Sequence, residues 1–506
     1  MKKFGFIFLL LISAISTRAQ EDIMMKYASD IDQAEMKEIL TILSSDALEG
    51  RETGKRGQKM AAAFIADYFQ RLGLQPVVPT DNGMSYYQKF DLESSKPGTT
   101  YLKADDVTYT NGDSILYYGS ANMQAPAKLH SVFAGNGTDQ EYASIKSAGN
   151  LVVVYAPDVS FQKWKEIKTK AYKNGAALVA IIAKDNDEDF KTMAQQYGHY
   201  FMGSSLGLKK EKSSSDNGSF LVGPSIAATI LDSSIDKMIK AIDDKNLSKI
   251  KGGSIEYITT REVTNVGTEN ILGFLEGTDK KDEIVIITAH YDHIGKRGEK
   301  INNGADDDGS GTTSVLKIAK AYMKAKNEGH GPRRSILFMT VTGEEKGLLG
   351  SEYYTNNPIF PLEQTVVDLN IDMVGRTDKK HEDDREFVYL VGSDKLSTEL
   401  HELSEKANDT FTNLSIDYTY NDPDHPDRIY YRSDHWNFAK HNVPIIFYFN
   451  GIHEDYHRPT DTVDKIEFDL LQKRAQLVFY TSWVIANRDQ RLVVDKILDV
   501  DTQPKR

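Results

Sequence analysis

Polar motifs that follow apolar runs are the feature of this chain that most constrains its fold. Four runs have the length and the branched, apolar composition of buried β-strands: DEIVIITA (282–289), RRSILFMTV (333–341), QTVVDLNI (364–371) and VPIIFYF (443–449). Each run is followed along the chain by a polar motif: HYD (290–292), GEE (343–345), Asp372 and YHRPTD (456–461). Open α/β folds place their sites at the carboxyl ends of sheet strands. The pattern therefore predicts an α/β fold in which these motifs converge.

The residue types in these motifs are those of a metal centre. Imidazoles and carboxylates, in the order His, Asp, Glu-Glu, Asp, His, suit two divalent ions that share one bridging carboxylate, with a spare Glu as base. A further motif, GADDDGSG (304–311), precedes a helix expected near 313–324 and offers the bridge. Spacing does not decide whether Asp306, Asp307 or Asp308 fills that role.

The HYD motif offers a histidine ligand with a carboxylate beside it. His290 and Asp292 are two residues apart at a strand end, so their side chains face the same way. Metal-bound imidazoles usually donate their second N–H to such a carboxylate, which is the role expected for Asp292. His293 is a competing ligand, but it points to the other face if the strand continues.

The remaining motifs supply acids and a second histidine. Glu344 and Glu345 would repel each other at one site unless cations neutralise them, so one as ligand and one as base is the consistent interpretation. A lone carboxylate within an apolar strand, as at Asp372, is costly without a partner or metal. Either His453 or His457 is a candidate ligand from the loop after the last strand.

Composition limits the compartment and the partners. Two lysines precede an apolar run from Phe4 to Ile15, which predicts a signal peptide at residues 1–20 and a chain that is exported, periplasmic or secreted. No stretch is long enough for stable membrane insertion. The absence of cysteine excludes disulfides and thiolate metal sites. A net charge of −13 disfavours nucleic acid as a partner.

The rest of the chain divides by pattern. A four-residue periodicity at Met60, Phe64, Tyr68 and Leu72, before Gly73, predicts helices within 31–74. A strand-rich region without candidate ligands predicts a separate insert, in which 203–219 is a loop and PSIAATIL (224–231) a strand. The expected parts are an N-terminal helical part of the metal-bearing domain (21–94), the insert (95–260), the rest of that domain (261–490, closed by a helix at 468–487) and a tail (491–506).

Together the five motifs resemble the co-catalytic two-zinc exopeptidase family, which includes secreted bacterial aminopeptidases, glutamate carboxypeptidase, glutaminyl cyclase and the transferrin receptor. The resemblance covers roughly 265–490 and the segment LSSDALEGRETGKRG (43–57). It implies a three-layer α/β sandwich with a mixed central sheet. The insert resembles, by pattern only, a strand-rich α/β protease-associated domain.

The resemblance also implies a role for each residue. His290 and Asp372 would hold one zinc ion, Glu345 and His457 the other, and Asp307 would bridge them. Glu344 would be the general base, Asp292 would orient His290, and Tyr456 would support the oxyanion. The expected function is an exported aminopeptidase that acts on peptide substrates with two zinc ions. A carboxypeptidase or dipeptidase, an acyltransferase of the glutaminyl cyclase type and a non-catalytic binding protein stay open as alternatives.

The segment RIYYRSDHWNFAKHNVPI (428–445) contains the S-D-H of this family, but its neighbours do not identify a side-chain preference. Pocket candidates within it are Tyr430, Tyr431, Arg432 and Trp436. Arg432 is the residue that a carboxypeptidase or dipeptidase would need as a cationic clamp.

Overall fold

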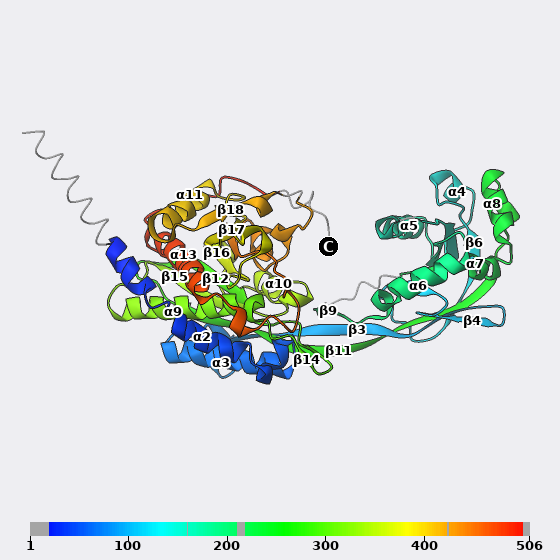
Figure 1. The fold of residues 1–506 in the computed structure, drawn as a ribbon. Helices are drawn as coiled ribbons and strands as arrows, with labels where there is room; N and C mark the ends of the chain where they lie inside the picture. Colours follow the sequence, from blue (N-terminus) through cyan, green and yellow to red (C-terminus); the bar gives the residue numbers. More distant parts are fainter. Residues whose placement is uncertain (1–19, 159, 210–217, 423–424, 499–506) are drawn as a thin grey trace, which may run out of the picture. The chain divides into compact units, whose positions relative to one another are not determined.

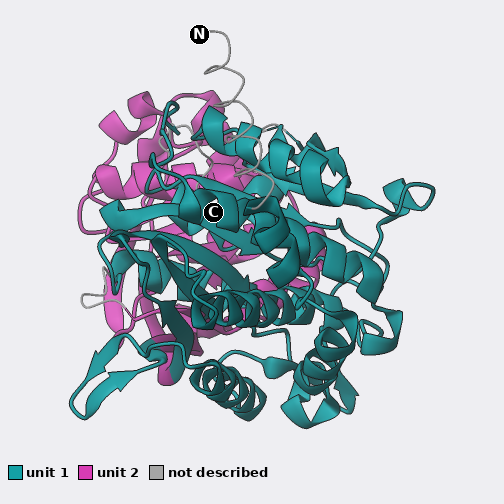
Figure 2. Ribbon diagram, turned by 90° about the vertical axis from the view of Figure 1, so that its left-hand side faces the viewer, with its two compact units in different colours: residues 1–91, 267–506 teal, residues 92–266 magenta. Residues whose placement is uncertain are grey.

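The computed structural model describes residues 20–158, 160–209, 218–422 and 425–498 (Figure 1). The chain forms two compact units, residues 1–91 with 267–506, and residues 92–266 (Figure 2). The second unit overlaps the insert expected at 95–260. Its assignment as a protease-associated-like domain stays a prediction.

Within the described part of the chain, no helix combines the length and the apolar character that crossing a membrane requires. The expected signal peptide at 1–20 lies outside the described residues except for Gln20. Export of the chain therefore stays a prediction.

A mixed β-sheet forms the centre of the first unit. Its order is β18 (Ser415–Asp417), β17 (Phe387–Val391), β19 (Ile445–Phe449), β16 (Thr365–Ile371), β12 (Lys280–His290), β15 (Arg334–Val341) and β11 (Ser254–Leu275). The strands β19, β16, β12 and β15 are mutually parallel, whereas β17 and β11 run antiparallel to β19 and β15. All four apolar runs of the sequence form strands, as predicted, and the structure makes them adjacent in one sheet.

Helices cover both faces of this sheet. One set of alternate strand side chains, such as Val285 and Ile287, packs in a core with α2 (Gln33–Leu43), α3 (Arg56–Leu72), α9 (Gly311–Asn327) and α13 (Phe468–Asn487). The other set, such as Ile284 and Ile286, packs with α10 (Leu349–Asn356) and α12 (His435–Ala439). The short helix α11 (Thr398–Ala407) lies against α13. This arrangement confirms the predicted three-layer α/β sandwich.

The buried stripe of α3 differs from the periodicity seen in the sequence. Met60 is 37% exposed, and the buried residues are Gly57, Gln58, Ala61, Ala62, Ile65, Ala66 and Phe69. Small alanines let α3 approach the core closely, and the larger side chains lie at the edge of that contact. The helix ends as predicted at Gly73, which has φ of +81°.

The second unit contains a further set of paired strands. The parallel strands β6 (Ala127–Phe133), β7 (Leu151–Tyr155), β8 (Leu178–Ile182) and β10 (Ser219–Val222) are followed by the antiparallel β5 (Leu116–Tyr118). Strands β4 (Val107–Thr110) and β9 (Ser205–Leu208) each pair with β3 (Tyr87–Ala104). The helices are α4 (Asp139–Ala143), α5 (Phe161–Lys173), α6 (Asp187–Met202), α7 (Pro224–Leu231) and α8 (Ile235–Asp243).

Two expectations for this unit are wrong. PSIAATIL is the helix α7, because Pro224 occupies the first helical position, where a missing N–H costs nothing. A short continuous apolar run does not distinguish a strand from a buried helix. The region 203–219, expected as a loop, contains the strand β9, and its residues 210–217 lie outside the described part.

Candidate metal centre

The strand order explains why the motifs converge. Strands β15, β12, β16 and β19 are neighbours and run parallel, so their carboxyl ends lie along one edge of the sheet. His290 is the last residue of β12, and Asp372 directly follows β16. The GEE motif and the loop with His457 follow β15 and β19. Residues from four separate segments therefore meet at this edge.

A first cluster joins His290, Asp307 and Asp372. The Nε2 atom of His290 lies 3.3 Å from Oδ1 of Asp307 and 3.5 Å from Oδ1 of Asp372. All three side chains are buried. Ser433 donates a 2.6 Å hydrogen bond to the second carboxylate oxygen of Asp372 and so fixes its orientation.

A second cluster forms around the other carboxylate oxygen of Asp307. The Nε2 atom of His457 lies 3.2 Å from Oδ2 of Asp307 and 3.1 Å from Oε2 of Glu345. The Nδ1 atom of His293 lies 2.7 Å from Oε1 of Glu345. Asp307 therefore presents one oxygen to each cluster, which is the geometry required of a bridging ligand.

The other two aspartates of the GADDDGSG motif have structural partners. Asp306 accepts hydrogen bonds from the backbone amide of Gly375 and from the ring of His453. Asp308 accepts from the backbone amides of His290, Gly311 and Met373. Of the three aspartates, Asp307 is thus the one whose carboxylate contacts both clusters. His453 pairs with Asp306 and is not part of either cluster.

His293 lies in the second cluster, although the sequence argument set it aside. That argument assumed that the strand continues beyond His290, whereas β12 ends there. The backbone then turns, and the amide of His293 donates to the carbonyl of Arg51. The end of the strand reverses the direction in which the His293 side chain points.

Asp292 lies between His290 and Glu344. Its carboxylate accepts a hydrogen bond from the hydroxyl of Thr53 at 2.6 Å and from the backbone amide of Glu344 at 3.3 Å. The Nδ1 atom of His290 lies 3.0 Å from the backbone carbonyl of Asp292 and 3.7 Å from its carboxylate. The main chain of Asp292 is therefore the nearer partner of His290, and the orienting role of its carboxylate stays a prediction.

The two neighbouring glutamates have opposite pKa shifts. Burial, together with the carboxylates of Glu345 and Asp372, raises the pKa of Glu344 well above its usual value. Burial also acts to raise the pKa of Glu345, but the neighbouring imidazoles of His293 and His457 lower it to about 2. Glu345 is thus a permanent anion suited to a ligand, whereas Glu344 binds a proton readily.

The chemistry of the clusters fits divalent cations. Within each of two groups, His290 with Asp307 and Asp372, and His293 with Asp307 and Glu345, the donor atoms lie within 4.8 Å of one another. Oδ2 of Asp307 and Oε1 of Glu345 are buried and have no hydrogen-bond partner among the described residues. Buried carboxylate oxygens are costly unless a cation or donor compensates them. A metal ion in each group would supply that compensation.

A small cavity of about 40 Å³ opens beside the clusters. Its polar wall includes Asp307, Glu344, Asp372, Tyr456 and Arg432, and its apolar wall includes Met373, Ile429, Phe447, Phe449 and Ile452. Nη2 of Arg432 lies 3.3 Å from the hydroxyl of Tyr456. Of the four pocket candidates, Arg432 lines this cavity, whereas Tyr430 and Tyr431 are buried in the core and Trp436 packs against it.

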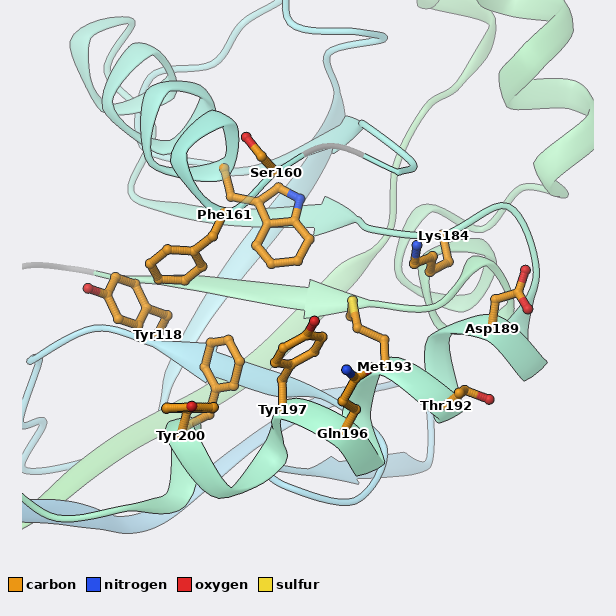
Figure 3. A pocket seen from close by; sticks show the side chains of 12 residues that line it. Tyr118, Ser160, Phe161, Lys184, Asp189, Thr192, Met193, Gln196, Tyr197 and Tyr200 are labelled. Atoms are coloured by element: carbon orange, nitrogen blue, oxygen red, sulfur yellow. The ribbon is translucent and has the colours of Figure 1, made fainter. Parts of the chain in front are cut away.

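A larger cavity of about 780 Å³ lies within the second unit (Figure 3). Aromatic side chains dominate its wall, among them Tyr118, Phe161 and Tyr197. Its lining contains no histidine. Among the described residues, both groups that could hold a metal ion lie in the first unit.

Comparison with known proteins identifies the first unit. Residues 270–482 match the model of peptidase family M28. The chain contains a peptidase family M28 domain. This confirms the predicted family and the prediction that the chain is a peptidase. The M28 domain includes His290, Asp307, Glu345, Asp372 and His457.

Relatives match beyond the M28 domain. The chain is 24% identical to aminopeptidase YwaD of Bacillus subtilis over 443 residues, which cover 86% of this chain and 81% of that protein. A probable leucine aminopeptidase of Arthroderma otae is 29% identical over 215 residues, 41% of this chain and 55% of that protein. The solved aminopeptidase from Aneurinibacillus sp. strain AM-1 has the same fold, with a TM-score of 0.54 and 20% identity over 94% of this chain and 98% of that one.

The sequence did not predict the structural roles of two residues that support the M28 domain. Arg51, outside residues 270–482, is fully buried and donates hydrogen bonds to the carbonyls of Leu43, Tyr291, Asn303 and Gly304. Asp461 accepts hydrogen bonds from the backbone amides of Asp306 and Asp307. Both act through backbone atoms of distant loops, so no local pattern signals them.

Proposed function

We propose that the chain is a zinc-dependent aminopeptidase that binds two zinc ions and removes amino-terminal residues from peptides. The observation that carries the proposal is the position of Asp307, whose two carboxylate oxygens face two separate His–carboxylate clusters. The names of the M28 relatives support the amino-terminal activity.

Each cluster contains the ligands that the proposal needs. His290 and Asp372 would hold one ion, Glu345 and His457 the other, and Asp307 would hold both. Imidazole nitrogen and carboxylate oxygen are ordinary zinc ligands. Bound zinc supplies an activated water molecule and polarises the scissile carbonyl.

Glu344 is placed to move protons. It lines the small cavity beside Asp307 and Asp372, and its raised pKa means that its carboxylate takes up a proton readily. It would accept the proton of the attacking water and donate it to the leaving amine. The half-buried phenol of Tyr456 lines the same cavity and would donate a hydrogen bond to the oxygen that becomes negative in the transition state.

The polarity of the cavity favours the amino end of the substrate. The carboxylates of Glu344 and Asp372 line it, and they attract a protonated α-amine. The apolar wall of Met373, Phe447 and Phe449 then accepts the first side chain of the peptide.

Arg432 favours a second candidate, a carboxypeptidase or dipeptidase. Its guanidinium lines the same cavity, where it could form charge-assisted hydrogen bonds with a substrate carboxylate. Its contact with the hydroxyl of Tyr456 offers a different role, in which it holds that phenol in place.

Product analysis of a zinc-loaded sample tests the proposal. The chain is incubated with an unblocked peptide of five different residues, and the products are identified by mass spectrometry over time. Sequential release from the amino end, lost with a chelator and restored by zinc, is expected. Release from the carboxyl end supports the second candidate instead. Metal analysis of the active sample gives two zinc ions per chain if both clusters are used.

A further inference from the structure

His293 is closely packed at the second cluster. Its side chain is fully buried, and Gly304 leaves the space that the imidazole ring occupies. A Cβ atom on Gly304 would lie 2.6 Å from Cδ2 of His293, and Gly304 has φ of +57°. Any larger residue at 304 would therefore displace the ring as well as strain the backbone.

The contact between His293 and Glu345 is close but is not a hydrogen bond. Nδ1 of His293 and Oε1 of Glu345 are 2.7 Å apart, yet neither has a hydrogen-bond partner among the described residues. Oδ2 of Asp307, 3.7 Å from Nδ1, also lacks one. Three buried polar atoms thus lie close together, and none of them has a hydrogen-bond partner among the described residues. A cation there satisfies all three.

We propose that Nδ1 of His293 is a further ligand of the second zinc ion. This inference rests on the proposed function, because it adds a ligand to one of its two ions. The second ion then has four protein ligands: His293, His457, Glu345 and Asp307. The first ion has three: His290, Asp307 and Asp372.

The two sites therefore differ in character. Four protein ligands complete a tetrahedral zinc site, whereas three leave a position open to water or substrate. The second site is the tighter one, and it fills first when zinc is added to the metal-free chain. The first site exchanges its metal more readily and keeps the open position.

X-ray absorption at the zinc edge, on full-length chain loaded with one equivalent of zinc, tests this assignment. The wild-type spectrum is expected to contain two imidazoles, from His293 and His457. The spectrum of His293→Ala is expected to contain one. His290→Ala is the matched control, because it removes a histidine of the first site and leaves the two-imidazole spectrum unchanged. A single imidazole in the wild-type spectrum would overturn the proposal without any variant.

A second substitution separates a ligand from a hydrogen-bond donor. The amide of His293→Asn can donate to Glu345 but is a poor zinc ligand. Zinc affinity of the tight site, measured by titration of the metal-free chain, is expected to fall more than tenfold in both His293→Ala and His293→Asn. Wild-type affinity in His293→Asn would overturn the ligand role. If that result came with two bound zinc ions and normal peptide cleavage, the proposed function would stand; a wild-type chain that binds no zinc would overturn both.

Discussion

The carboxylate of Asp461 accepts hydrogen bonds from the backbone amides of Asp306 and Asp307, at 3.0 to 3.2 Å. The loop that carries His457 thereby fixes the backbone of the loop that carries the shared aspartate. Asp461 does not reach either cluster itself. Its effect on the metal site is to hold Asp307 in position for both clusters.

Replacing Asp461 with Ala is therefore expected to weaken zinc binding without removing a ligand. Mutation of a residue that holds a metal ligand in place typically lowers metal affinity by about 10–100-fold. Asp461→Asn keeps one acceptor oxygen and should lose less. Zinc titration of the two variants checks this order, and equal affinity for Asp461→Ala and wild type would contradict it.

Substitutions should distinguish the roles of the adjacent glutamates Glu344 and Glu345. Glu344→Gln keeps the shape of the side chain but does not accept the proton of water, so kcat should fall by about 10²-fold or more while zinc stays bound. Glu345→Gln removes a ligand charge and should lose zinc affinity first. Steady-state kinetics with metal analysis on each variant distinguishes the two roles. Wild-type turnover in Glu344→Gln would show that another group is the base.

Zinc binding should release protons. In the metal-free chain, burial acts to lower the pKa of His457, but Asp307 and Glu345 raise it to about 10. Its imidazole is therefore protonated at neutral pH, whereas zinc binds the neutral form. Apparent zinc affinity should increase as the pH rises toward that value. Calorimetric titrations in buffers of different ionisation enthalpy measure the released protons, and affinity independent of pH would contradict this.

Arg51 should matter for stability rather than for chemistry. Its four hydrogen bonds to backbone carbonyls join three segments of the chain, which are the end of α2, the residue after β12 and the loop at 303–304. A lysine keeps the charge but not the planar fork of donors. One hydrogen bond to a charged group contributes about 1.5–3 kcal/mol. Arg51→Lys should therefore lower the free energy of unfolding by this amount or more. Urea denaturation of the metal-free chain measures it. Arg297→Lys, at an exposed position, is the control.

The sequence predicts those parts of the site that depend on local pattern. Apolar runs predict the strands, and their parallel order brings His290 and Asp372 to one edge. What the sequence did not predict depends on where elements end or on distant backbone atoms. The direction of His293 requires that β12 stops at His290, and the role of Arg51 requires loops that are far apart in the chain. The prediction of a strand at PSIAATIL was wrong because such an apolar run fits a buried helix as well as a strand.

The most direct test of the account compares peptides blocked at either end. Acetylation removes the positive charge of the α-amine and adds bulk in a cavity lined by Glu344 and Asp372. The account predicts that kcat/KM falls more than tenfold, about 1.4 kcal/mol of transition-state binding, while amidation of the carboxyl end changes it little. The contradicting result is a large fall in kcat/KM on amidation but not on acetylation, together with loss of that sensitivity to amidation in Arg432→Ala. It would rule out an aminopeptidase and assign the site to the carboxyl end of the substrate.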